Sequence, residues 1–80
     1  MIEEYLNEYG YKKTEIDKIL NNKNLKNICL KKIKEVNKFL EDMNIPKNKI
    51  IKMTSYFPNL YSYKLETIVS KLLYFEKMGY

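Results

Sequence analysis

Tyr5-Leu-Asn-Glu-Tyr-Gly-Tyr11 is the first of three similar seven-residue segments along this chain. The other two are Phe39-Leu-Glu-Asp-Met-Asn-Ile45 and Tyr74-Phe-Glu-Lys-Met-Gly-Tyr80. In each segment two polar positions separate apolar ones, and Gly or Asn precedes a closing apolar residue. This order is typical of the last turn of a helix and of a stop in the left-handed conformation. The predicted stop residues are Gly10, Asn44 and Gly79.

The segments start 34 and 35 residues apart, and a fixed period of this size indicates a helical-repeat array. Apolar residues between the segments align at the same spacings, and the one-residue difference falls in a predicted loop, where an insertion costs little. The aligned pairs are Ile16 with Ile50, Ile19 with Met53, Leu25 with Leu60, Leu30 with Leu65, and Ile33 with Ile68. We therefore predict one all-α domain over residues 1–80. It should have about five helices, with repeat units at roughly 11–45 and 45–80 after a half-unit at 1–10.

Apolar steps of three and four residues predict where the individual helices lie. We expect long helices at 28–43 and 62–78, and a shorter first helix at 2–9. Two short helices should lie between them, one after an N-cap at Thr14 and one around 50–53. The predicted breaks are at 21–24 and 55–59. Cys29 falls on the apolar stripe of the first long helix, so we expect it to be a buried thiol.

Composition excludes several classes of protein. The 80 residues contain no His, one Cys and two Gly, so no zinc site, catalytic dyad or glycine-rich phosphate loop is expected. We predict a non-enzymatic protein without a cofactor or small-molecule substrate. Neither a signal peptide nor a membrane-spanning segment is recognisable, so no membrane partner is expected. The expected location is inside the cell: the cytoplasm, or an organelle if the chain belongs to a longer eukaryotic protein.

Lysine positions suggest contacts to an acidic partner. The net charge is +5, and all fifteen basic residues are Lys. A row on the first long helix could lie along phosphates, while two further pairs recur at the 34-residue spacing. The row is Lys31, Lys34 and Lys38, and the recurring pairs are Lys13 with Lys47 and Lys18 with Lys52. The alternatives are an ordinary solvated face for the row and common descent of a duplicated unit for the pairs.

Aromatic residues gather around Pro58. Tyrosine is enriched at protein interfaces, so Tyr56 and Tyr63 are candidate partner-binding residues. For Phe57 and Tyr61 we expect a place in the core, with a phenol group that reaches water.

A period of 34–35 residues first suggests tetratricopeptide or pentatricopeptide repeats, but the chain has none of the Ala on which their close packing depends. The second unit instead resembles the mitochondrial transcription termination factor (mTERF) family. The similar features are a short helix at Ile50-Ile-Lys-Met53, Pro58-Asn-Leu60, a long helix from Leu65 to Leu72, and the closing segment 74–80. The first unit matches in part, since Asn24 stands where the family's motif has Pro.

This resemblance implies right-angled helix pairs in a curved array, with double-stranded nucleic acid in a basic groove. Our leading functional prediction is therefore a nucleic-acid-binding module that contacts mainly the phosphate backbone. The alternative is a small protein-interaction module, an adaptor or inhibitor, that displays Tyr and Lys on a helical array.

Overall fold

The computed structural model describes residues 2–25 and 28–77, and all regular secondary structure in them is helical. The α-helices are α1 (Ile2–Tyr9), α2 (Lys13–Leu20), α3 (Leu30–Asp42), α4 (Lys47–Tyr56) and α5 (Leu65–Lys77). Two short 3-10 helices, η1 (Lys23–Leu25) and η2 (Pro58–Ser62), lie between them. The predicted all-α class is therefore confirmed.

Helix α1 ends at the predicted glycine. Gly10 has a φ of +122°, which L side chains rarely adopt. The amide of Tyr11 donates to the carbonyl of Leu6 at 3.0 Å, and the amide of Gly10 donates to that of Asn7 at 3.2 Å. These two hydrogen bonds form a Schellman motif, which satisfies carbonyl groups that the helix end leaves unpaired.

Helix α3 ends in the same way. Asn44 has a φ of +65°, and its amide donates to the carbonyl of Glu41 at 2.8 Å. The amide of Ile45 donates to the carbonyl of Leu40 at 3.2 Å. The first two seven-residue segments thus share one local fold. The stop predicted at Gly79 lies outside the described residues.

The start of α2 differs from the prediction. Lys12 precedes the helix in extended backbone, and its amide donates to Oε1 of Glu15 at 2.7 Å. Glu15 thereby supplies the carboxylate half of a capping box two positions earlier than expected. Thr14 lies inside the first turn of α2, so the N-cap predicted there is wrong.

Helix α3 begins two residues later than predicted, at Leu30. Cys29 stands immediately before it in extended backbone and is exposed. The prediction of a buried thiol is therefore wrong, because it extended the helical stripe across a residue that precedes the helix.

The break predicted at 55–59 starts later than expected. Helix α4 continues through Ser55 to Tyr56, and Ser55 is buried. Pro58 then opens η2, which occupies the start of the predicted 62–78 helix and delays α5 to Leu65. Proline suits a first helical position because its missing N–H is not needed there.

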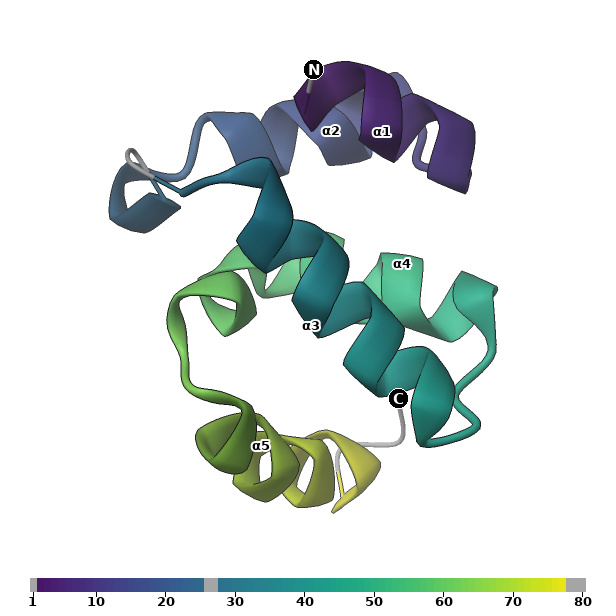
Figure 1. Ribbon diagram of the computed structural model, residues 1–80, viewed down its shortest axis with the longest axis vertical. Coiled ribbons are helices and arrows are strands. Elements are labelled where there is room, and N and C mark those ends of the chain that lie inside the picture. The colour runs from purple at the N-terminus through teal and green to yellow at the C-terminus, as the bar shows by residue number, and fades with distance from the viewer. Residues whose placement is uncertain (1, 26–27, 78–80) are drawn as a thin grey trace.

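Figure 1 shows α1, α3 and α5 one below another, with α2 behind α1 and α4 behind α3. Helix α2 packs against both α1 and α4, α3 packs against α4, and η1 packs against η2. Two of these contacts, α2 with α4 and η1 with η2, join elements that the 34–35-residue alignment equates. Stacked repeats would produce such contacts, although the repeat array itself stays a prediction.

Burial follows the alignment closely. Four aligned pairs are buried on both sides, and in the fifth both leucines are half-buried. The buried pairs are Ile16 with Ile50, Ile19 with Met53, Leu25 with Leu60, and Ile33 with Ile68. The half-buried pair is Leu30 with Leu65. The core predicted from the sequence is therefore correct at these positions.

Candidate nucleic-acid interface

The lysine row of α3 lies at the protein surface. Lys31, Lys34 and Lys38 are exposed, while Ile33 and Val36 of the same helix are buried. Residues three and four apart lie on one side of a helix, so the three ammonium groups share a side. Seven residues at about 1.5 Å each separate the ends of the row by about 10 Å along the helix.

Two tyrosines of α1 lie beside this row. Nζ of Lys34 is 5.6 Å from the centroid of the Tyr5 ring, and the Tyr5 and Tyr9 rings are 5.8 Å apart. The two rings share a side of α1 because they are four residues apart. A lysine over an aromatic ring at such a distance gains about 0.5–1 kcal/mol at an exposed site. Tyr5 therefore helps to hold the Lys34 side chain in place.

Tyr9 connects three helices. Its ring lies under Lys47, the first residue of α4, with Nζ 4.7 Å from the centroid. Its hydroxyl donates to Oε2 of Glu41 in α3 at 2.6 Å. A second lysine is thus held over an aromatic ring next to the first. We call Lys31, Lys34, Lys38, Lys47, Tyr5 and Tyr9 together the lysine–tyrosine surface.

The two phenol groups add no negative charge to this surface. Burial raises the pKa of Tyr9, and its hydrogen bond to Glu41 raises the pKa further. Burial likewise raises the pKa of Tyr5. Both rings are therefore neutral at physiological pH. The hydrogen bond from the Tyr9 hydroxyl does place one negative group, the carboxylate of Glu41, next to this surface.

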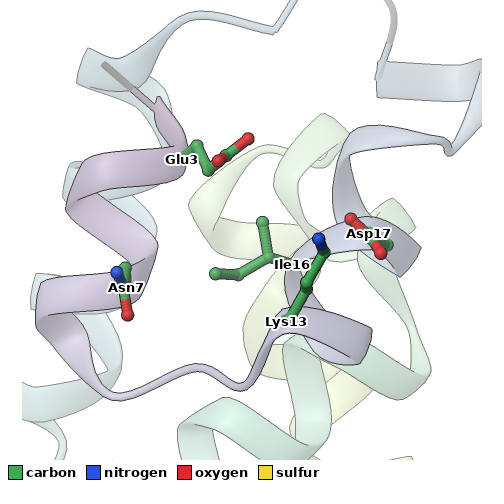
Figure 2. Close-up of a pocket in the computed structure, with 5 residues that line it drawn as sticks. All are labelled: Glu3, Asn7, Lys13, Ile16 and Asp17. Atoms are coloured by element: carbon green, nitrogen blue, oxygen red, sulfur yellow. The ribbon is translucent and has the colours of Figure 1, made fainter.

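Lys13 lies in a different setting. Figure 2 shows it in a groove between α1 and α2, with Glu3 and Asn7 on one side and Ile16 and Asp17 on its own helix. The groove has a volume of about 310 Å³. Its two carboxylates would repel a phosphate group. The structure therefore does not give Lys13 the surroundings of Lys47, its counterpart 34 residues later.

The two lysines of the second recurring pair, Lys18 and Lys52, also lie in different surroundings. Lys18 of α2 lies over the ring of Tyr56 in α4, with Nζ 5.2 Å from the centroid, whereas Lys52 is exposed on α4. Of the seven candidate lysines, Lys34 and Lys47 are thus the two that ring contacts bring together through α1.

The candidate partner-binding tyrosines differ in exposure. Tyr56 has 62% of its surface exposed. Tyr63 is half-buried, because its ring makes an edge contact with Phe57 at 6.1 Å and lies under Nζ of Lys71 at 5.6 Å. Tyr56 is therefore the better placed of the two to contact another protein.

A buried polar cluster at the centre of the molecule was not predicted. The Tyr61 hydroxyl donates to Oδ1 of Asn37 at 2.9 Å and lies 2.9 Å from the Tyr11 hydroxyl. The Tyr11 hydroxyl is in turn 2.6 Å from Oγ1 of Thr54. Tyr61 does fill the core as expected, but its phenol group binds other side chains and does not reach water.

This cluster ties the helices together. Asn37 belongs to α3, Thr54 to α4 and Tyr61 to η2, while Tyr11 precedes α2. Asn37 also donates from Nδ2 to the Tyr5 hydroxyl at 3.4 Å, which connects the cluster to the lysine–tyrosine surface. A sequence signal did exist, since Asn37 occupies an apolar-stripe position between Ile33 and Leu40. Polar residues at such positions are buried only when they are hydrogen-bonded.

Two further findings concern metals and membranes. Within residues 2–25 and 28–77, no group of three or more Cys, Asp or Glu side chains is arranged to hold a metal ion. Over the same ranges, no helix combines the length and apolar character needed to cross a membrane.

Comparisons of the chain with protein-family models, curated proteins and solved structures gave no match. The mTERF-like resemblance is therefore carried by the sequence features alone.

Proposed function

We propose that this protein binds nucleic acid through phosphate contacts made by the lysine–tyrosine surface. The observation that supports this most is the placing of Lys34 and Lys47 over the neighbouring rings of Tyr5 and Tyr9. Lysines held in this way lose less side-chain freedom when they bind phosphate. The exposed Lys31 and Lys38 extend the same charged region along α3.

The expected mode is weak, salt-sensitive and nearly independent of sequence. B-DNA places a phosphate about every 3.4 Å along each strand, so a row about 10 Å long can face about three of them. Lysine is a flexible point charge without the planar fork of Arg, which reads base edges in two contacts. The mTERF-like resemblance favours duplex DNA as the partner.

The test is fluorescence anisotropy of a labelled duplex of about 20 base pairs across a salt series. Four phosphate contacts predict a slope of log affinity against log salt of about −3.6. Removing the row with Lys31→Gln/Lys34→Gln/Lys38→Gln should reduce the size of this slope by about 2–3.

The matched control is Lys23→Gln/Lys49→Gln/Lys64→Gln, which removes three exposed lysines that are not part of the lysine–tyrosine surface. Both variants have a net charge of +2, compared with +5 for the natural chain. The control should keep most of the slope. Equal losses in both variants would show that net charge and not this surface determines binding. No binding at about 50 mM salt and tens of micromolar protein would refute the function itself.

A protein partner is the second candidate function. Tyr56 supports it, because a tyrosine with 62% of its surface exposed can anchor an interface. Two results together would favour this second candidate: the natural chain does not bind duplex DNA, and Tyr56→Ala loses binding to a protein that co-purifies with the natural chain.

A further inference from the structure

Helix α5 carries an exposed apolar stripe. Val69 has 41% of its surface exposed and Leu73 has 61%, while Leu65 and Leu72 are half-buried beside them. In sequence order, residues 65, 69, 72 and 73 are separated by four, three and one positions, which places them on one side of the helix.

Single exposed apolar residues are normal, but a contiguous stripe on one helix indicates an interaction site. The more extensive contacts between described elements join α1, α2, α3, α4, η1 and η2, and α5 takes no part in them. Ile68 of α5 is fully buried in the core, and the half-buried Leu65 and Leu72 pack against that core. The exposed part of the stripe, at Val69 and Leu73, therefore remains accessible to an incoming partner.

Charges along the edge of the stripe indicate which partner fits. Glu66 lies in the first turn of α5, and Lys77 lies in its last turn. They are eleven residues apart, about three full turns, so both project from the same side. Leu73 lies between them on that side, seven residues after Glu66 and four before Lys77. One edge of the stripe is thus negative at its start and positive at its end.

We infer that two copies of this chain associate through α5 in an antiparallel pair. A two-fold axis between α5 helices brings each Glu66 beside the partner's Lys77. The same register places Val69 within one residue, about 1.5 Å along the axis, of the partner's Leu73, so apolar and charged contacts form together. A parallel pair would instead place like charges side by side.

The expected association is weak. One helix from each copy buries less than the roughly 1,200–2,000 Å² of stable protein interfaces, so dissociation constants of about 10 µM to 1 mM are expected. Dimerisation therefore depends on protein concentration.

Sedimentation equilibrium between about 20 µM and 1 mM protein, at low salt, tests this inference. The natural chain should shift from mainly monomer toward dimer, and Leu73→Glu should stay monomeric throughout. Leu20→Glu is the matched control, since Leu20 has 40% of its surface exposed on α2, at the other end of the molecule in Figure 1. It should still dimerise, and circular dichroism should show that both variants are folded. A natural chain that is monomeric at about 1 mM would overturn the inference, as would a Leu73→Glu variant that still dimerises.

Charge exchange tests the antiparallel register. Glu66→Lys and Lys77→Glu should each weaken dimerisation about threefold or more, because each places like charges together. The combined variant should recover most of the natural affinity. A combined variant as weak as the single ones would overturn the proposed register. The duplex-binding experiment does not depend on either result, since it concerns residues of α1, α3 and α4.

Discussion

Replacing Asn37 should destabilise the fold through the partners it leaves behind. Asn37 is fully buried, and the part of the chain that the structure describes has a hydrogen-bond partner for every buried side-chain nitrogen and oxygen. Asn37→Leu keeps the number of side-chain heavy atoms but removes the acceptor of the Tyr61 hydroxyl at 2.9 Å. A buried polar group without a partner costs about 1–3 kcal/mol. We expect a loss of about 2 kcal/mol in the free energy of unfolding.

Tyr61→Phe should cause a similar loss, because it leaves Oδ1 of Asn37 unpaired. The double variant removes both groups, so its loss should be smaller than the sum of the single losses by at least about 1 kcal/mol. Urea denaturation followed by circular dichroism measures all three. Asn48→Leu is the control, since Asn48 is exposed on α4 and should change stability by less than about 0.5 kcal/mol. Additive losses, or an Asn37→Leu variant as stable as the natural chain, would show that this cluster does not hold the helices together as described.

Three further predictions concern stability. Leu40→Ala should cost about 2–4 kcal/mol in urea melts because Leu40 is fully buried, whereas Leu72→Ala should cost about 1 kcal/mol because Leu72 is half-buried. Equal losses would contradict this difference in burial between the two leucines. Gly10→Ala should cost about 1–3 kcal/mol, because Gly10 has a φ of +122° and the new Cβ would lie 3.3 Å from the Ile51 side chain of α4. A stabilised variant would show that α1 continues through this position. Burial raises the pKa of Tyr11 and Tyr61 above the ordinary 10.0, so the tyrosines of the unfolded chain ionise first and the free energy of unfolding should fall above about pH 10. Urea melts at pH 8 and 10.5 would check this, and the fall should be smaller for Tyr61→Phe.

Periodicity in the sequence was sufficient to predict the helices and much of the core. The stops at Gly10 and Asn44 were predictable because few residues tolerate a positive φ. The burial of pairs such as Ile33 and Ile68 followed from the 35-residue alignment. Helix starts were less predictable, since the carboxylate of Glu15 caps α2 from inside the helix, whereas the sequence pattern favoured an N-cap at Thr14.

The surroundings of side chains could not be predicted from spacing alone. Lys13 and Lys47 are equivalent in the alignment, but one lies beside two carboxylates and the other over Tyr9. The difference arises because different residues of α1 meet the two lysines: Glu3 and Asn7 line the groove of Lys13, whereas Tyr9 lies under Lys47. The buried cluster around Asn37 likewise depends on four segments that meet only in the folded chain.

The position of the binding surface can be measured most directly by a nitrogen-15 NMR titration with a duplex of about 20 base pairs at low salt. We expect the largest amide shifts at Tyr5, Tyr9, Lys34, Lys38 and Lys47, with small shifts across α5. Salt should reverse these shifts, because phosphate contacts release counterions. Shifts confined to Tyr56 and α5, or no shifts at tens of micromolar duplex, would contradict the assignment of nucleic-acid binding to the lysine–tyrosine surface.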